Sequence, residues 1–476
     1  MTATEKPSAS VHGSDLLRLV GADVEVPILP SGTRRYVNLD YAASAPALRV
    51  VHDAVEELLG WYSSVHRGAG FKSRASTAAY EGARESIRDF VNARPDDAVI
   101  ITRNTTDSIN LLAGTLPEGT HVVAFAGEHH ANLLPWKRIG VRYLPVPETP
   151  ADMLEQLAST LRDLPHCEDP HLVAVTGASN VTGEIWPVGE IARVAHEHGA
   201  RLLVDAAQLA PHTRIDMQRD RIDYLALSGH KLYAPYGAGA LVGERDWLSA
   251  GDPFLRGGGA VKLVTIEETL WADLPDRQEA GSPNVIGAVA MGVACDALAA
   301  AGMDSIAAEE AELLAHARER LATVDGFEAY GVWSPDHPRV GLLTFNVRGV
   351  PYDLLASVLS AEYGIGIRHG CFCAHPLMVR LLRVDDAEIN RLLDETRAGH
   401  HERLPGAARM SVGLGTTKAD LDSLTDALRA IAADGPRWTY AVDARTGEYE
   451  ADPDPRPLPS LSMRLADHAR GHGESA

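Results

Sequence analysis

A lysine and an aspartate follow two short apolar runs of this sequence. Asp205 comes directly after residues 201–204, and Lys231 lies four residues after the run 225–227. Taken alone, such an aspartate is usually a helix cap, and such a lysine is usually a surface group with a buried stem. Presented together on neighbouring strand ends, they match the needs of pyridoxal phosphate: an amine to form a Schiff base and a carboxylate to keep the pyridine nitrogen protonated, which makes the ring an electron sink.

Hydroxyl and imidazole groups near other strand ends could complete such a site. Thr105 and Thr106 stand at a strand-to-helix turn, where hydroxyls and backbone N–H groups favour a phosphate; a plain helix cap is the alternative. Ser228 and His230 could supply further phosphate contacts. His129 follows another apolar run and could stack on a flat ring and move protons, although a structural histidine is the competing interpretation.

Two cysteines lie in a segment with the composition of a loop, RHGCFCAHP (368–376). Free cysteines are usually inert core fillers, but an electropositive, partly open loop favours a thiolate at Cys371 or Cys373. These two residues cannot form a four-ligand zinc site alone. The chain has only 4 cysteines, too few for a disulfide framework, which indicates a reducing compartment and predicts a cytoplasmic protein.

The composition narrows the class of protein. The chain has 476 residues, 45% of them hydrophobic and 23% charged, as in ordinary globular proteins. Its formal net charge of -21 disfavours nucleic acids and anionic membranes as partners, because both are polyanions. The polar N-terminus lacks the apolar core of a signal peptide. The most apolar stretch, 285–303, contains Asp296 and is interpreted as a packed helix rather than a membrane span.

Short apolar runs alternate with helical patterns through most of the chain. Strands separated by helices imply parallel pairing, and ligands of such sheets bind at the carboxyl ends of the strands. The candidate residues above fall at those ends. The predicted strands are 98–102, 121–125, 172–176, 201–204, 225–227 and 239–242, with helices at 108–116 and 188–198.

We expect four parts along the chain. An N-terminal segment, 1–35, is predicted to be partly disordered and to pack on the smaller domain. Residues 36–290 form the large cofactor-binding domain. Residues 291–435 form a smaller α/β domain with a mixed sheet, and the acidic, proline-rich tail 436–476 is predicted to be disordered. The smaller domain is assigned strands at 342–347 and 365–368 and helices at 306–324 and 418–432.

Taken in order, these motifs resemble the class V, fold-type I pyridoxal-phosphate enzymes, and within them the group II cysteine desulfurases and selenocysteine lyases. The resemblance covers about residues 36–430 and implies an α/β fold: a large domain with a mostly parallel seven-stranded sheet and a smaller α/β C-terminal domain. It is carried by NLDYAASAP (38–46), SSVHRGAG (63–70), TRNTTDSINL (102–111), GEHHANLLPW (127–136), GASNVTGEIWPV (177–188), LLVDAAQ (202–208), SGHKLYAPYGAGAL (228–241), EAGSPN (279–284), RHGCFCAHPLM (368–378) and RMSVGLGTT (409–417).

The resemblance implies roles around the cofactor. Lys231 takes the place of the Schiff-base lysine, Asp205 that of the partner of the pyridine nitrogen, and Gln208 that of the residue bonded to the ring hydroxyl. Ser282 replaces a threonine that reaches the phosphate from a neighbouring subunit, which implies a homodimer. The remaining implied cofactor contacts are the stacking and catalytic His129, Asn180 near the ring hydroxyl, and the phosphate ligands Thr105, Thr106, Ser228 and His230.

On the substrate side, Arg409 matches the arginine that clamps the substrate carboxylate, a bidentate task suited to guanidinium. Asn180, Ala42 and His66 are the other implied substrate contacts. Cys373 matches the cysteine that accepts sulfur, which implies a sulfur-acceptor protein as a possible partner.

Three features depart from the family pattern. Tyr41 is bulky where a small or amide residue is common, and we expect it to reshape the substrate pocket. Cys371 is an additional thiol. The segment 379–408 is longer than the family pattern by about twenty residues; we expect it to contain an inserted helix and loop that border the mouth of the site.

The expected activity is removal of sulfur or selenium from an L-cysteine-type substrate, with a persulfide on Cys373 and release of alanine. The alternative is a class V enzyme acting as a C–S lyase, aminotransferase or epimerase on another amino acid. A third possibility, a non-catalytic cofactor sensor or partner-binding protein, is disfavoured because Lys231, Asp205 and Arg409 occur together.

Overall fold

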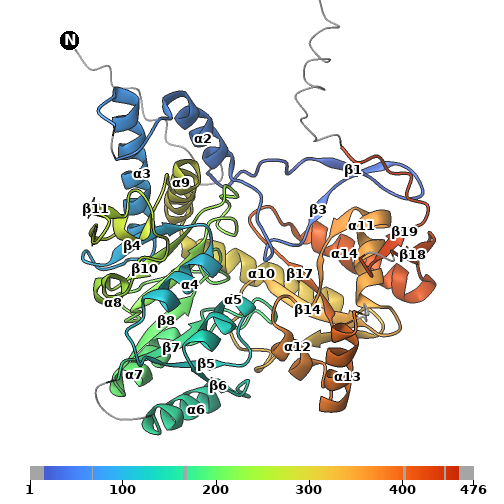
Figure 1. Ribbon diagram of the computed structural model, residues 1–476. Helices are drawn as coiled ribbons and strands as arrows, with labels where there is room; N and C mark the ends of the chain where they lie inside the picture. The colour runs from blue at the N-terminus through green and yellow to red at the C-terminus, as the bar shows by residue number, and fades with distance from the viewer. Residues whose placement is uncertain (1–15, 67, 165–168, 400–403, 444–445, 460–476) are drawn as a thin grey trace, which may run out of the picture.

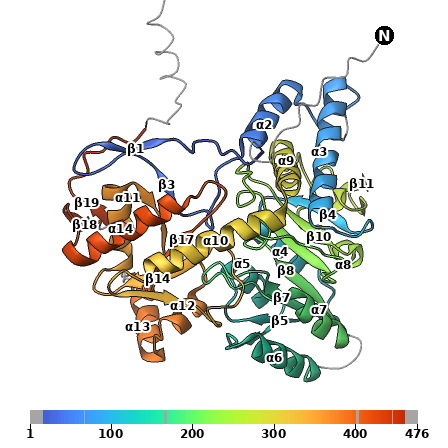
Figure 2. The same cartoon turned by 180° about the vertical axis from the view of Figure 1, so that it is seen from behind.

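The computed structural model describes residues 16–66, 68–164, 169–399, 404–443 and 446–459. Two bodies lie side by side, and the long helix α10 (Met303–Leu321) runs from one toward the other (Figures 1 and 2). The larger body is built on a central seven-stranded sheet, and the smaller on a four-stranded sheet.

The seven-stranded sheet has the order β4-β10-β9-β8-β7-β5-β6. Its strands pair in parallel except β10, which is antiparallel to both neighbours. This confirms the predicted mostly parallel sheet of seven strands. The bounds are β4 Ala98–Thr102, β5 His121–Phe125, β6 Val141–Leu144, β7 His171–Thr176, β8 Ala200–Asp205, β9 Tyr224–Ser228 and β10 Gly239–Gly243.

Helices cover both faces of this sheet, and the strands are correspondingly apolar on both faces. Val99 and Val123 point toward a core formed with the helices α3, α6, α7 and α9. Their neighbours Ile100 and Val122 point toward the opposite core, formed with α4 and α8. The helices are α2 Arg49–Trp61, α3 Phe71–Phe90, α4 Thr105–Thr115, α5 His130–Leu133, α6 Pro150–Arg162, α7 Val188–Glu197, α8 Arg245–Ala250 and α9 Val285–Ala301.

The parallel pairing brings several strand ends to one edge of the sheet. Thr176 on β7 is paired with Asp205 on β8, and Asp205 is paired with Ala226 on β9. Because β4, β5, β7, β8 and β9 all run in one direction, the turns that follow them open at the same edge. His129, Asn180, Gln208 and Lys231 follow β5, β7, β8 and β9 at this edge, and Thr105 begins the helix after β4.

The smaller body packs α10, α11 (Tyr352–Tyr363) and α14 (Lys418–Asp434) on a sheet of order β13-β14-β17-β16. Every pair in this sheet is antiparallel, so the predicted mixed sheet is wrong; parallel pairing occurs separately, between β15 and β3. The strands are β3 Val37–Asn38, β13 Phe327–Tyr330, β14 Leu342–Val347, β15 Ile365–Gly366, β16 Arg368–Gly370 and β17 Ala407–Ser411.

The two ends of the chain also contact the smaller body. Strands β1 (Glu25–Pro27) and β2 (Thr33–Arg35) form a hairpin, and Arg35 at the end of β2 contacts Asp420 on α14. Strands β18 (Tyr440–Val442) and β19 (Tyr449–Ala451) pair with each other, and β19 contacts α11. The prediction of a disordered tail is therefore wrong for the described residues between 436 and 459, while residues 1–15 and 460–476 lie outside the described chain.

The predicted insertion contains helix α13 (Asp386–Arg397), which follows α12 (His375–Leu381). Asp385 caps α13 by accepting a hydrogen bond from the backbone N–H of Glu388. In the described chain no single helix is long and apolar enough to cross a membrane; α9 and α10 reach that length only together, across a bend of 78°. The division of the chain into domains at 35, 290 and 435 stays a prediction.

Candidate active site

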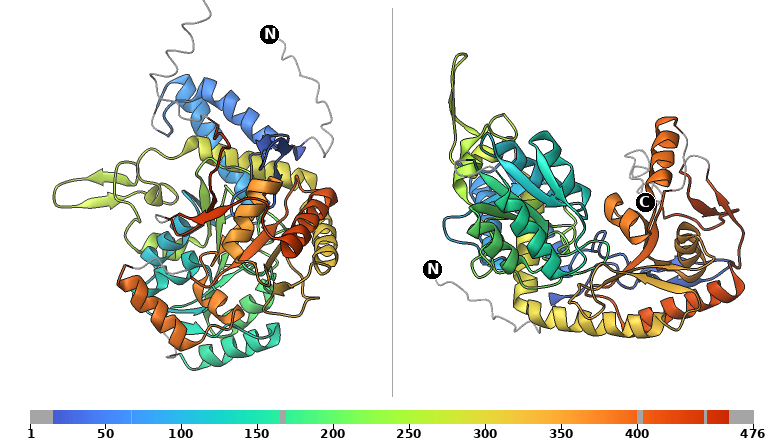
Figure 3. Two further views of the ribbon diagram at one scale, coloured as in Figure 1. Left: turned by 90° about the vertical axis from the view of Figure 1, so that its right-hand side faces the viewer. Right: turned by 90° about the horizontal axis from the view of Figure 1, so that it is seen from below.

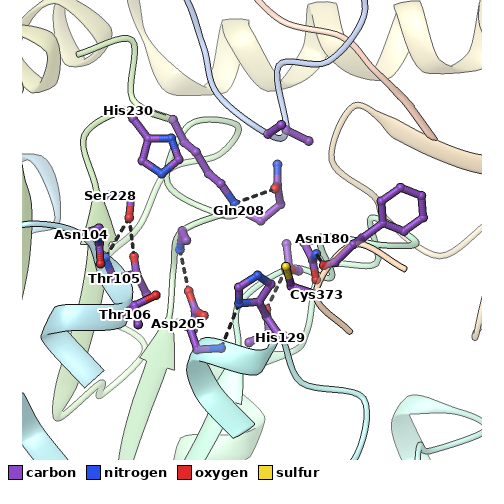
Figure 4. Close-up of a pocket in the computed structure, with 18 of the residues that line it drawn as sticks. Asn104, Thr105, Thr106, His129, Asn180, Asp205, Gln208, Ser228, His230 and Cys373 are labelled. Carbon is purple, nitrogen blue, oxygen red and sulfur yellow. Dashed lines mark hydrogen bonds between the residues drawn. The ribbon is translucent and has the colours of Figure 1, made fainter. Parts of the chain in front are cut away.

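A cavity of about 270 Å³ lies where the strand ends of the sheet meet the cysteine loop of the smaller body (Figure 4). Its size is close to that of pockets for small ligands. It brings together twelve of the predicted site residues: Ala42, Thr105, Thr106, His129, Asn180, Asp205, Gln208, Ser228, His230, Lys231, Cys373 and Arg409.

Lys231 and Asp205 both reach this cavity, from the turn after β9 and the end of β8. Burial lowers the pKa of the Lys231 amine to about 8, and the nearby Asp205 carboxylate opposes part of that effect. Burial likewise raises the pKa of Asp205, whose Oδ1 accepts a hydrogen bond from the Ala207 N–H at 3.0 Å. A buried carboxyl group with so few partners favours a cation beside it.

Gln208 lies next to the lysine. Its Oε1 accepts a hydrogen bond from Lys231 Nζ at 3.3 Å, and the side chain is buried (Figure 4). The amide therefore stands between the lysine and the interior of the larger body, in contact with the same cavity.

The opposite end of the cavity has the features of a phosphate seat. Asn104 caps α4, its Oδ1 accepting from the Asp107 N–H at 3.0 Å. Ser228 Oγ accepts from the Thr105 N–H at 2.8 Å and lies 2.9 Å from Thr105 Oγ1, so two hydroxyls meet at the helix start. The Thr106 N–H belongs to the first turn, where no carbonyl of the helix can accept it. Hydroxyls and N–H groups at a helix N-terminus suit an anion.

His129 caps the N-terminus of α5 and lines the cavity. Its Nδ1 accepts a hydrogen bond from the Ala131 N–H at 3.1 Å, which assigns the proton of the neutral imidazole to Nε2. Burial lowers the pKa of His129 to about 4, with the Lys231 charge as a second cause. The imidazole is therefore neutral near pH 7 and can lie against a flat ring without the cost of burying a charge.

Cys373 is held over the cavity by a loop with unusual backbone geometry. Phe372 and Cys373 both have a φ of 54°, a conformation that side-chain-bearing residues rarely adopt. Two hydrogen bonds from the larger body fix this loop: the His130 N–H donates to Cys373 O at 2.7 Å, and Asn180 Nδ2 donates to Phe372 O at 2.7 Å. Cys373 is exposed.

The additional thiol, Cys371, has a separate environment. Its Sγ lies 3.0 Å from Nε2 of His375, and Nδ1 of His375 lies 3.0 Å from Nε2 of His130. Cys371 does not line this cavity. Among the cysteines of the described chain, Cys373 is the one that lines the same cavity as Lys231.

Arg409 is buried at the side of the cavity nearest the smaller body. Nη1 donates to Asn180 O at 2.6 Å and Nη2 to Asp40 Oδ1 at 3.3 Å, while Nε has no partner among the described residues. The Phe372 ring lies under the guanidinium, 4.9 Å from its carbon to the ring centroid. Burial lowers the pKa of Arg409 to about 10, so it remains a cation that can bind a carboxylate.

Two expectations about the pocket shape are not met. Tyr41 is buried against Tyr233, with ring centroids 6.2 Å apart, and it does not line the cavity. Its bulk fills space beside Gly413, where a side chain would collide with the Tyr41 ring. No described residue of 379–408 lines the cavity either.

Two predicted residues lie elsewhere in the protomer. Ser282 and His66 line a separate cavity of about 420 Å³. His66 Nε2 lies 2.9 Å from Glu81 Oε1, and its ring packs edge-on against Tyr80. The single chain therefore does not bring Ser282 to the phosphate seat.

Eight cavity residues were not among the predicted site residues. They are Ala43, Asn104, Ala131, Thr176, Ala178, Ala207, Arg368 and Phe372. Asn104 had a visible signal, because asparagine three residues before Asp107 at a helix start is a common cap. The others carry no distinctive pattern.

The groups that line the cavity match the functional groups of pyridoxal phosphate one by one. A buried carboxyl at Asp205 suits a protonated ring nitrogen, and the amine of Lys231 suits an aldehyde. The start of α4 suits the phosphate, and the neutral His129 suits the ring face. The fold and this pairing define an α/β enzyme of fold type I.

Comparison with known proteins agrees with this definition. The family model described as aminotransferase class-V matches residues 37–424. A probable cysteine desulfurase of Halalkalibacterium halodurans is 38% identical over 405 residues, covering 82% of this chain and 92% of that protein. A probable cysteine desulfurase of Halobacterium salinarum is 34% identical over 445 residues, covering 90% and 98%. The chain therefore belongs to the class V aminotransferase family.

Solved structures show the same likeness. The cysteine desulfurase CsdA from Escherichia coli, in an S-sulfonic acid form, is 31% identical with a TM-score of 0.69, covering 83% of this chain and 94% of that one. The apo cysteine desulfurase from Thermococcus onnurineus is 26% identical with a TM-score of 0.72 and the same coverage.

Proposed function

We propose that this protein is a pyridoxal-phosphate-dependent cysteine desulfurase that moves sulfur from L-cysteine, or a related sulfur or selenium amino acid, to Cys373. The observation that carries the proposal is that the exposed Cys373, the half-buried Lys231 and the buried Asp205 and Arg409 line one cavity. The relatives named cysteine desulfurase support it.

In this proposal Lys231 would hold the aldehyde of the cofactor, Asp205 its ring nitrogen and Gln208 its ring hydroxyl. His129 would contact the ring, and Thr105, Thr106, Ser228 and His230 would bind the phosphate. When bound, pyridoxal phosphate supplies an electron sink that stabilises negative charge at the substrate α-carbon. The protein residues orient the substrate, move protons and accept sulfur.

Arg409 orients the substrate by binding its α-carboxylate. The Asn180 carbonyl and Asp40 hold the guanidinium in place, and Nε has no partner in the described structure. A fixed guanidinium presents two parallel N–H donors, so the substrate side chain points in one direction. Asn180, whose amide also holds the Cys373 loop, adds to this orientation.

Lys231 would act as the base that moves the α-proton of the bound substrate. A pKa near 8 leaves part of the amine neutral at physiological pH, as a general base requires. The Cys373 thiolate then attacks the substrate sulfur: a new S–S bond forms and the substrate C–S bond breaks, with its electron pair left on the substrate carbon. Protonation of that carbon, which we assign to His129 or solvent, and return of the α-proton from Lys231 to the α-carbon complete alanine, and the sulfur stays on Cys373 as a persulfide.

A second copy of this chain completes the proposed assembly. Ser282 and His66 line a cavity outside the main site. Helices α2 and α3 and the hairpin of β11 (Val261–Val264) and β12 (Thr269–Trp271), which projects from the larger body (Figure 3), carry exposed apolar side chains. Exposed apolar surface of this kind favours association. The exposed side chains are Leu59, Trp61, Tyr62, Phe71, Leu263, Val264, Ile266 and Leu270.

We further propose that the sulfur leaves Cys373 for a protein acceptor, because the thiol is exposed. Neither nucleic acid nor membrane is a partner in this proposal, given the net charge of -21. The proposed location is the cytoplasm, since 4 cysteines in 476 residues suit a reducing compartment.

The persulfide step is tested by comparing Cys373→Ala with Cys371→Ala. Purified holoenzyme is incubated with L-cysteine, and alanine is quantified while mass spectrometry locates the added sulfur. We expect the sulfur on Cys373 and a loss of alanine formation by at least about 100-fold in Cys373→Ala, because no other thiol lines the described cavity. Cys371→Ala is the matched control and retains most activity.

The same experiment separates the alternative reactions. A C–S lyase releasing pyruvate, an aminotransferase or an epimerase does not need Cys373. Full turnover by Cys373→Ala, with no sulfur on the wild-type loop peptide, would contradict the proposed desulfurase and favour one of these reactions.

A further inference from the structure

A chain of three buried polar side chains leads away from Lys231 into the protein interior. Lys231 Nζ lies 3.3 Å from Gln208 Oε1, Gln208 Nε2 lies 3.0 Å from His212 Nε2, and His212 Nδ1 lies 2.7 Å from Glu310 Oε2. The last two side chains do not line the cavity, and the proposed reaction does not use them.

The chemistry of the groups sets the direction of each hydrogen bond. The lysine amine donates to the carbonyl oxygen of Gln208, so the amide nitrogen of Gln208 faces His212. That nitrogen can only donate, which makes His212 Nε2 the acceptor and puts the imidazole proton on Nδ1. The Nδ1–H then donates to the Glu310 carboxyl group, which fixes both the tautomer and the rotation of the ring.

The chain is isolated from solvent. Gln208 is 3% exposed, His212 4% and Glu310 5%. Glu310 Oε1 is buried without a partner in the described structure, an arrangement that costs stability. The cost indicates that the carboxyl group serves something other than packing.

Glu310 lies on α10, far along the sequence from the strand-end turn that carries Gln208 and His212. Figure 2 shows α10 running from the larger body toward the smaller one. The carboxyl group also approaches Gly341, the residue before β14, where an added Cβ would lie 3.3 Å from Glu310 Oε2. The amide beside Lys231 is thus supported from a rigid helix that both bodies contact.

We infer that His212 and Glu310 are positioning residues that hold the Gln208 amide in the one orientation able to serve the cofactor and Lys231 together. The Gln208 NH₂ group has two hydrogens. His212 accepts one, which leaves the other for the ring hydroxyl of the cofactor. This inference rests on the proposed function, in which Gln208 contacts that hydroxyl.

The test compares purified holoenzymes of wild type, His212→Phe and Glu310→Gln. Phenylalanine keeps the ring volume but makes no hydrogen bond, whereas glutamine keeps an acceptor for the His212 Nδ1–H. We expect His212→Phe to lower the affinity for pyridoxal phosphate and the kcat/KM with L-cysteine by about tenfold each, the effect of one lost orienting hydrogen bond. It should also move the pH midpoint of the visible absorption of the bound cofactor. Glu310→Gln should show smaller changes in the same direction.

His196→Phe is the matched control. His196 Nε2 pairs with Asp223 Oδ2 at 2.8 Å, another histidine–carboxyl pair, and it does not line the main cavity. We expect His196→Phe to leave cofactor affinity, the absorption midpoint and kcat/KM within about twofold of wild type, whatever it does to thermal stability.

A double-mutant cycle with Gln208→Ala separates positioning from general damage to the core. If His212 acts through Gln208, His212→Phe causes no further loss in the Gln208→Ala protein. An undiminished tenfold loss in that background overturns the inference, as does a wild-type absorption midpoint and affinity in His212→Phe. If His212→Phe does not fold, the same cycle is made with Glu310→Gln.

The outcome also distinguishes the two proposals. A wild-type protein that binds no pyridoxal phosphate overturns both the proposed function and this inference. A wild-type protein that binds the cofactor and forms alanine, with unaltered His212 and Glu310 variants, overturns the inference alone.

Discussion

Glu128 is a buried carboxyl group, next in sequence to His129, whose protonation makes the stability of the fold depend on pH. Its Oε1 and Oε2 accept hydrogen bonds from the Thr176 N–H at 2.9 Å and Asn132 Nδ2 at 2.8 Å. Burial raises its pKa from the ordinary value of 4.5 to about 8, and Asp205 adds to the shift. The folded protein therefore keeps a proton that the unfolded chain releases between these two values.

The sign of the effect on stability follows from that difference. Between about pH 5 and pH 8 the folded state binds more protons at Glu128 than the unfolded state, so this group makes the free energy of unfolding fall as pH rises. In Glu128→Gln the decrease in the free energy of unfolding should be smaller, by ~1 kcal/mol or more over this pH interval. Urea denaturation from pH 5 to 8.5 measures it, with the exposed Glu85→Gln as control. Parallel curves for wild type and Glu128→Gln would contradict the assignment.

Single site residues could be predicted from the sequence where a local pattern marks them. Lys231, Asp205 and Thr105 could be predicted because each stands at the end of an apolar run. Tyr41 was misjudged because its partner, Tyr233, is distant in the sequence. Glu310 was not recognised for the same reason: its contact with His212 depends on tertiary packing that no local pattern contains.

Elements with strong apolar periodicity were predicted well, and those held by polar contacts were not. The observed bounds of β5 and β14 agree with the predicted ones, since both strands are apolar runs inside a core. The strands β18 and β19 were predicted as disordered tail because their composition is acidic and rich in proline. They are ordered by Glu362 on α11, a buried carboxylate that accepts hydrogen bonds from the Arg437 N–H, the Trp438 N–H and Tyr440 OH.

Glu362→Ala tests this docking of the tail. The substitution removes the acceptor for several donors at once, so we expect residues 437–451 to lose protection in hydrogen exchange and the protein to lose about 2–3 kcal/mol of stability. Glu328→Ala, on the exposed side of β13, is the control and should change little. Unchanged exchange in the tail of Glu362→Ala would show that other contacts hold it.

For the whole molecule, two predicted residues, Ser282 and His66, lie outside the main cavity of the single chain. Both were predicted from a resemblance, which for Ser282 implied a contact from a neighbouring subunit. In the proposed dimer that contact is intermolecular, so reasoning within one chain does not place it. The projecting β11–β12 hairpin, with Ile266 almost fully exposed at its tip, marks the surface we assign to the second copy (Figure 3).

Ile266→Glu should weaken the dimer. A charge at an exposed apolar tip costs little in the monomer but must be desolvated in an interface, so we expect the dissociation constant to rise at least about tenfold. Analytical ultracentrifugation of wild type and variant measures it, with Leu393→Glu on α13 as a control of similar chemistry at another surface. A monomeric wild type, or an unaffected Ile266→Glu dimer, would contradict the assigned interface.

The central claim is that one pyridoxal phosphate binds covalently to Lys231 in the cavity that Asp205 also lines. Borohydride reduction of the purified, cofactor-loaded protein, followed by proteolysis and mass spectrometry, tests it most directly. We predict one reduced pyridoxyl phosphate group, attached to Lys231, and none in Lys231→Ala. Attachment to a different lysine, or no attachment after loading, would contradict the account.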